Sequence, residues 1–72
     1  MEKADLSDAK LRWVNLAGAK LGRAKLSGAD LYKANLSQAD LREADLNEAN
    51  LHGTDLCGAN LHGANLCGAQ LP

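Results

Sequence analysis

The sequence predicts an all-β repeat protein whose chain turns a corner once in every five residues. Leucine recurs at every fifth position from Leu6 to Leu71, and no leucine lies elsewhere. Alanine stands two residues before each leucine, except at Val14 and Thr54. A fixed period identifies a repeat architecture before the propensities of single residues are considered. The 72 residues are therefore expected to form a single domain, 1–72.

The five-residue period excludes an amphipathic helix and a plain strand. Alanine and leucine favour helices, but five residues advance an α-helix by about 500°, so successive leucines would lie about 140° apart. A strand has a period of two, which would send alternate leucines to opposite faces. Neither element gathers the leucines on one side, so the chain must turn once per repeat.

Each repeat is expected to be a very short extended segment followed by a corner. Alanine and leucine are two residues apart, so both point inward and the polar residue between them faces water. Glycines two residues after a leucine suit a corner with positive φ; they are Gly18, Gly28, Gly53, Gly58, Gly63 and Gly68. Met1 falls in the leucine phase. The predicted core is Leu6, Leu11, Leu16, Leu21, Leu26, Leu31, Leu36, Leu41, Leu46, Leu51, Leu56, Leu61, Leu66 and Leu71.

Segments such as Ala34-Asn35-Leu36-Ser37-Gln38 and Ala44-Asp45-Leu46-Asn47-Glu48 match the pattern A(D/N)LXX. Through them, residues 4–72 resemble the pentapeptide-repeat proteins. That resemblance implies a right-handed quadrilateral β-helix with twenty residues per coil. Fourteen repeats then give about three and a half coils and a height of roughly 17 Å at the usual strand spacing. The departures at Lys10, Lys20, Lys25, Thr54 and Gln70 affect single repeats.

Composition restricts the classes of partner. Eight basic and nine acidic residues leave a net charge of −1, which argues against a general binder of nucleic acid or anionic membranes. The sequence has neither an apolar run long enough to cross a bilayer nor a signal-peptide pattern. Two cysteines are too few for a disulfide framework. We therefore expect a cytoplasmic protein that binds neither nucleic acid nor membrane. We also expect it to be of bacterial type.

A twenty-residue coil allows the sequence to be unrolled onto four faces. The face around Leu11 and Leu31 carries a summed charge of +2. It places Trp13 beneath Lys33 and Gly53, and it places Arg12 beneath Tyr32, His52 and Pro72. In the columns beside the leucines, Lys10 meets Asp30, Lys20 meets Asp40, and Lys25 lies between Asp5 and Asp45. Opposite charges on adjacent strands are expected to support the register.

Four residues resemble a zinc-ligand set, but their spacing argues against one. His52, Cys57, His62 and Cys67 each lie one repeat beyond the last, so they should occupy four successive faces and point away from one another. Tetrahedral coordination needs all four ligands at one point. The same geometry keeps Cys57 and Cys67 beyond disulfide reach, although exposed thiols could pair between molecules. We expect no metal.

Catalysis is not expected either. A nucleophile needs a base within hydrogen-bond reach and a concave site, whereas the predicted interior is filled with leucine and alanine. The carboxylates are scattered, and no phosphate-binding glycine loop is present. The sequence therefore predicts no catalytic residue and no cofactor.

The best candidate for function is a partner-binding face formed by Arg12, Trp13, Tyr32, Lys33 and His52. Aromatic residues and arginine are enriched at interface hot spots. The competing interpretation is a cation–π pair of Trp13 with Lys33 that merely decorates the surface, or a contact that covers the first coil.

Two classes of function follow. The first is a non-enzymatic scaffold or protein-interaction module with an unidentified partner. The second, implied by the family resemblance, is DNA mimicry that inhibits or protects a type II topoisomerase, although the net charge of −1 fits it poorly. A repeat fragment or a design without activity is a third reading. The coil ends expose strand edges, so self-association through the ends or a flat face is also expected, unless a longer chain has been cut.

Overall fold

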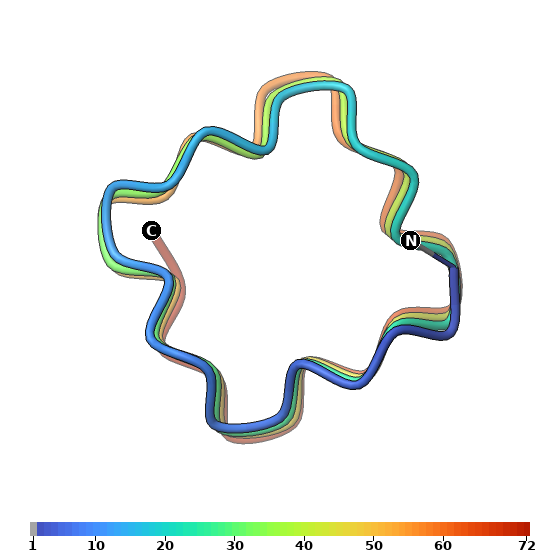
Figure 1. Ribbon diagram of the computed structural model, residues 1–72, viewed down its shortest axis with the longest axis horizontal. Coiled ribbons are helices and arrows are strands. Elements are labelled where there is room, and N and C mark those ends of the chain that lie inside the picture. Colours follow the sequence, from blue (N-terminus) through green and yellow to red (C-terminus); the bar gives the residue numbers. More distant parts are fainter. Residues whose placement is uncertain (1) are drawn as a thin grey trace.

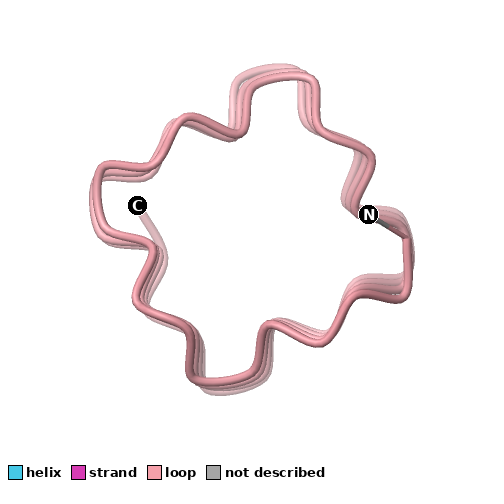
Figure 2. Cartoon of the chain, in the orientation of Figure 1, coloured by secondary structure: helices cyan, strands magenta, loops and turns pink. Residues whose placement is uncertain are grey.

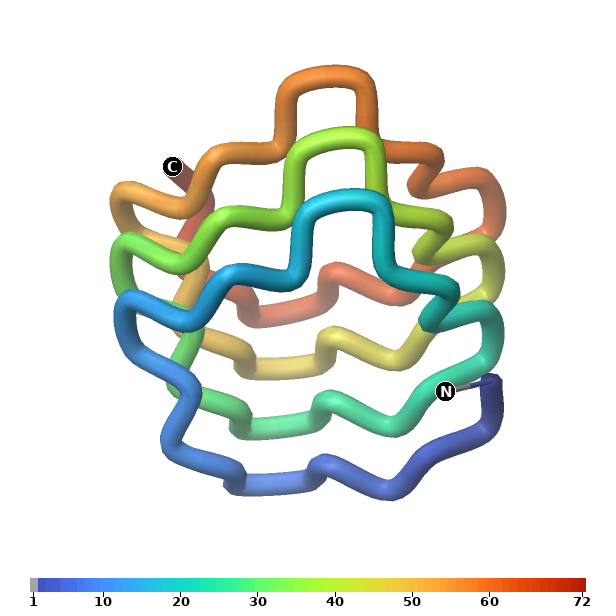
Figure 3. The backbone as a smooth tube through the Cα atoms, turned by 45° about the horizontal axis from the view of Figure 1, so that its top comes forward, coloured from blue at the N-terminus to red at the C-terminus, as the bar shows by residue number. Residues whose placement is uncertain are grey.

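The computed structural model describes residues 2–72 as one continuous right-handed coil with a roughly square outline. Viewed from the N-terminal end, the chain runs clockwise as it recedes from the viewer (Figure 1). Successive coils stack with their corners aligned (Figure 3). The predicted all-β, right-handed quadrilateral β-helix is therefore confirmed. Met1, which was expected in the leucine phase, lies outside the described residues.

Parallel bridges of one residue per side hold the coils together. Residues 2–72 contain no helix and no strand longer than one residue, so Figure 2 draws the chain as loop throughout. Every bridge joins positions twenty residues apart, as Asn35 joins Asp55. The bridged pairs are 5 with 25, 10 with 30, 15 with 35, 20 with 40, 25 with 45, 30 with 50, 35 with 55, 40 with 60, 45 with 65 and 50 with 70. The expected twenty-residue coil is thus confirmed.

Neighbouring coils are joined by backbone hydrogen bonds in both directions at the extended segment, and by a further bond to the next coil at the corner. Leu36 N–H donates to the Asp55 carbonyl at 2.8 Å, and Asp55 N–H donates to the Ala34 carbonyl at 2.9 Å. At the corner, Gln38 N–H donates to the Cys57 carbonyl at 2.8 Å. Such ladders satisfy the backbone groups that face a neighbouring coil, which explains why isolated bridges suffice to hold the fold.

Each corner is a two-residue turn that needs positive φ at its second residue. Ala39 N–H closes one such turn on the Leu36 carbonyl at 3.1 Å, and positive φ at the third of four turn residues is the pattern of a type II turn. The six predicted glycines have φ between 71° and 75°, which confirms their role. Eight other residues adopt the same conformation with φ between 55° and 64°: Lys3, Asp8, Trp13, Arg23, Lys33, Gln38, Glu43 and Glu48.

The polar residue between alanine and leucine also fixes the turn, a role that the sequence analysis missed. Its side-chain oxygen accepts a hydrogen bond from the N–H two residues later, as Asn35 Oδ1 accepts from Ser37 at 2.9 Å. Every Asp or Asn at this position does so: 5, 15, 30, 35, 40, 45, 50, 55, 60 and 65. Asp and Asn form such turns because their short side chains reach their own backbone. This preference was the available signal.

The core is a column of leucine and alanine side chains inside the coil. The seven leucines from Leu21 to Leu51 are 0% exposed. Thr54 lies among them, and its hydroxyl donates to the Leu31 carbonyl at 2.7 Å, which satisfies the buried oxygen. The leucines of the outer coils are only partly buried. The prediction of Leu71 as a core residue is wrong, since 58% of it is exposed, because no coil covers it.

The molecule is a short drum rather than a rod. Its principal extents are 21, 20 and 17 Å, and the shortest runs along the coil axis (Figure 1), in agreement with the expected height. At the C-terminal end, the chain turns inward toward that axis (Figure 1). Pro72 therefore does not continue the column above His52, contrary to expectation. No helix of residues 2–72 is long and apolar enough to cross a bilayer.

Candidate protein-interaction surface

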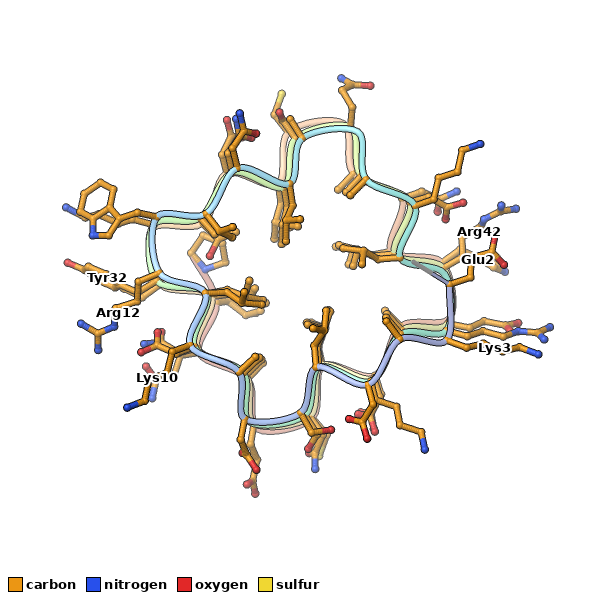
Figure 4. The ribbon with its side chains drawn as sticks, viewed as in Figure 1. Glu2, Lys3, Lys10, Arg12, Tyr32 and Arg42 are labelled. Atoms are coloured by element: carbon orange, nitrogen blue, oxygen red, sulfur yellow. The ribbon has the colours of Figure 1, made fainter. Side chains whose placement is uncertain are left out.

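Three stacked corners bring together the five residues predicted as a partner-binding face. These turns occupy residues 12–13, 32–33 and 52–53. Arg12 and Tyr32 project outward on the same side of the drum (Figure 4). We call Arg12, Trp13, Tyr32, Lys33 and His52 the aromatic patch.

The rings of the aromatic patch are in direct contact. Tyr32 and His52 stack with centroids 5.6 Å apart and an interplanar angle of 13°. Trp13 meets Tyr32 edge to face, with centroids 6.3 Å apart and an angle of 88°. Both arrangements are favourable for aromatic pairs. Three successive coils therefore contribute to one ordered surface.

Two cations lie against these rings. The Lys33 ammonium is 5.0 Å from the centroid of Trp13 and 5.4 Å from that of Tyr32. The guanidinium of Arg12 lies 5.2 Å from the centroid of Tyr32. All three distances are within cation–π range. The competing interpretation, a pair of Trp13 and Lys33 alone, is incomplete because Tyr32 shares the ammonium.

Asp30 fixes the position of Arg12, a contact that the sequence analysis assigned to another residue. One carboxylate oxygen accepts from Arg12 Nε at 2.5 Å, and the other accepts from Tyr32 N–H at 3.2 Å. The hydrogen bond from Arg12 lowers the pKa of Asp30 below its ordinary value and raises the pKa of Arg12. Asp30 thus remains ionised at neutral pH and holds the guanidinium near the aromatic ring.

The expected lysine partners do not form the ion pairs. The backbones of Lys10 and Asp30 are bridged, but Asp30 pairs with Arg12. In the same way, Lys20 is bridged to Asp40, whereas the guanidinium of Arg42 binds the Asp40 carboxylate at 2.9 and 2.8 Å. Arginine presents a planar fork that matches a carboxylate. Arg42 follows Asp40 by two residues in the same coil, whereas Arg12 reaches Asp30 from the neighbouring coil, eighteen residues earlier in the chain.

The aromatic patch leaves a large apolar group in solvent. Trp13 is 68% exposed, although most other large apolar side chains of residues 2–72 point inward. Gly53 helps to place Lys33 beside it: a Cβ at Gly53 would lie 2.8 Å from the Lys33 Cγ. The absence of a side chain in the third coil therefore leaves the space that the lysine stem occupies.

A second surface feature is a shallow hollow on the opposite side of the drum. It arises at Gly22, where a column of side chains is interrupted between Glu2 and Arg42. Its lining is charged and largely self-paired: Glu2, Gly22, Arg23, Asp40, Arg42, Glu43 and His62. Arg42 pairs with Asp40, and Arg23 pairs with Glu43 at 3.0 Å. Because these charges neutralise one another, the hollow offers less to a ligand than the aromatic patch.

The histidines and cysteines lie at successive corners. His52, Cys57, His62 and Cys67 each occupy the first residue of a different turn. Both cysteines are free thiols on the surface. Across residues 2–72, no three His, Cys, Asp or Glu side chains are grouped so as to hold a metal ion.

Comparison with known families identifies the repeat. The family model described as Pentapeptide repeats matches eight copies over residues 4–42 and 34–71. The chain belongs to the pentapeptide-repeat family. This pentapeptide-repeat protein matches no curated protein.

Several solved structures resemble this pentapeptide-repeat protein. A pentapeptide repeat protein from Nostoc, alr5209, shares 46% identity over 96% of this chain with a TM-score of 0.66. AT2G44920, from the thylakoid lumen of Arabidopsis thaliana, shares 35% identity over 92% of this chain with a TM-score of 0.53. The chain spans 61% and 49% of the lengths of these two proteins.

Proposed function

We propose that this protein is a non-enzymatic interaction scaffold whose contact surface is the aromatic patch. The observation that carries the proposal is the 68% exposure of Trp13 beside ordered aromatic and cationic neighbours. Leaving so large an apolar group in water is unfavourable, and burial beneath a partner would recover that free energy. The repeat supplies a stiff base for the contact, because parallel bridges join each coil to the next.

Pre-organisation supports the same role. Tyr32 is contacted by Trp13, His52, Arg12 and Lys33, so a partner would order few side chains when it binds. Ordering flexible side chains at an interface opposes association. A surface whose members already restrain one another avoids much of that cost.

The test is affinity capture with a matched pair of double variants. Trp13→Ala with Tyr32→Ala should lose proteins that the wild type retains, whereas Ser37→Ala with Gln38→Ala should retain them. The control residues form the turn that follows the Tyr32 turn along the chain. Quantitative mass spectrometry measures the difference. Unchanged recovery with the aromatic variant would overturn the proposal.

A topoisomerase inhibitor or protector is the weaker candidate. A net charge of −1 and a drum only 17 Å tall offer little resemblance to a long polyanion. We expect no effect in a gyrase supercoiling-protection assay. Clear protection at stoichiometric protein would favour this second function over the scaffold.

We also propose that the protein is located in the cytoplasm. Fractionation of cells that express a tagged chain would test this location.

A further inference from the structure

We infer that the aromatic patch recognises an acidic, extended segment of a partner protein. The inference rests on the proposed function and adds the chemistry of the partner. It follows from the charges that remain available on the patch once the contacts within the chain have been made.

Lys33 keeps hydrogen-bonding capacity for a partner. The ion pairs within residues 2–72 join Arg12 to Asp30, Arg23 to Glu43 and Arg42 to Asp40, so Lys33 pairs with none of these carboxylates. Its ammonium lies against two aromatic rings. An ammonium has three N–H donors, and a ring face attracts the charge without supplying a strong acceptor oxygen. A carboxylate from outside would supply one.

The surroundings of the patch also favour an anionic partner. Lys10 makes no ion pair with any carboxylate of residues 2–72 and lies on the same side as Arg12 (Figure 4). Asp30 is the acidic residue of this face, and Arg12 already neutralises it. Carboxylates of a partner would therefore meet Lys10 and Lys33, while an apolar side chain of the same segment covers Trp13. Complementary charge of this kind sets orientation and specificity.

The same charges favour a peptide over a nucleic acid. The preceding corner carries Asp8 and Glu48, and none of its turn residues is a cation. A polyphosphate backbone would place charge against these carboxylates as well as against the lysines. A peptide can place its carboxylates individually, with neutral residues between them. An acidic segment thus fits the alternation of charge around the patch better.

The experiment uses Trp13, the single tryptophan of the chain, as the reporter. The intact protein is titrated with a short peptide of alternating glutamate and leucine, and its intrinsic fluorescence is recorded. A peptide of alternating lysine and leucine and a short oligothymidine are the comparison probes. We expect a saturable change with the acidic peptide, little response to the other two, and weaker binding as salt is raised, because exposed charge contacts are screened.

Matched lysine variants distinguish a contact with Lys33 from a general effect of the protein's charge. Lys33→Gln should weaken binding of the acidic peptide by about tenfold, which corresponds to roughly 1.4 kcal/mol. Lys3→Gln should leave the affinity unchanged: Lys3 has the same turn position and positive φ but lies on the opposite side of the drum (Figure 4). Equal effects of the two substitutions would overturn the inference.

Other outcomes distinguish the inference from the proposed function. Stronger binding of oligothymidine or of the basic peptide would reject an acidic partner. If Trp13→Ala with Tyr32→Ala still lost captured proteins, the scaffold proposal would survive that rejection. Concentration-dependent self-association abolished by Lys33→Gln would instead identify a second copy, with its Asp8 and Glu48 corner, as the occupant and would also reject a separate partner.

Discussion

Asp30 accepts a hydrogen bond from Arg12 at 2.5 Å and holds the guanidinium 5.2 Å from the centre of the Tyr32 ring. The same carboxylate accepts from the Tyr32 N–H. One side chain therefore closes a turn of the scaffold and orders the surface beside it. Repeat geometry and surface chemistry are joined at this residue.

Acid should destabilise the protein partly through Asp30. Its pKa lies below the ordinary value of 3.8, chiefly because of the Arg12 hydrogen bond, and the pKa values of Asp40 and Asp5 are also lowered. A lowered pKa stabilises the fold above the unfolded value, and this stabilisation is lost as pH falls through the folded value. The temperature midpoint of thermal unfolding should therefore decrease as the pH is lowered below about 4.

The variant Asp30→Asn provides the comparison for acid unfolding. It removes the titrating group, so its midpoint should decline less steeply than that of the wild type over the same pH range. Identical slopes for the two proteins would show that the Arg12 contact contributes nothing to acid sensitivity.

Positive φ at the second turn residue should make the stability of the fold depend on whether glycine occupies that position. Gly18 has φ of 71°, and a Cβ there would meet no atom within 4 Å. Gly18→Ala therefore reports backbone strain alone and should destabilise by about 1 kcal/mol. In the next coil, Gln38→Gly removes a side chain from a residue with φ of 61° and should stabilise the fold by about 0.5 kcal/mol. Chemical denaturation measures both, and effects of the same sign would contradict this account.

Core substitutions should follow depth in the stack. Leu36 is 0% exposed, so Leu36→Ala should cost about 2 to 5 kcal/mol. Leu71 is 58% exposed, and Leu71→Ala should cost less than about 1 kcal/mol. Urea denaturation provides the comparison. Similar losses for the two variants would mean that the terminal leucine is covered in solution.

The side-chain caps of the turns should contribute individually. Asn15 Oδ1 accepts from the Ala17 N–H at 3.1 Å, so Asn15→Ala should destabilise by about 0.5 to 1.5 kcal/mol. Asn15→Asp keeps the acceptor next to the neutral Asn35 and should remain near wild-type stability. If the two variants unfold at the same denaturant concentration, the hydrogen bond is not the source of the preference for Asp and Asn.

The sequence predicted the fold because the period itself excludes the alternatives. Leucine spacing placed Leu21 to Leu51 inside the coil, and the twenty-residue register placed Tyr32 beneath His52. Side-chain reach was harder to foresee. Lys10 is the backbone neighbour of Asp30, yet Arg12 forms the ion pair, because the choice depends on rotamers rather than on register.

The remaining differences concern ends and local turns. Leu71 follows the five-residue period but has no coil above it, so the period alone wrongly predicts that it is buried. The ten side-chain caps were missed because the polar residue was assigned to solvent alone. Asn15 is exposed, and its side-chain oxygen still accepts from the Ala17 N–H, so exposure and a structural role coincide.

The register of twenty residues gives this surface an evolutionary property. Removing one complete repeat between Trp13 and Tyr32 would shift all later residues by one corner of the coil. Each leucine would still point into the core. The rings would then part without a cavity opening in the interior. Gain or loss of single repeats can therefore shuffle surface residues into new neighbourhoods in quarter turns, and a family built in this way can change its partners without having to redesign its core.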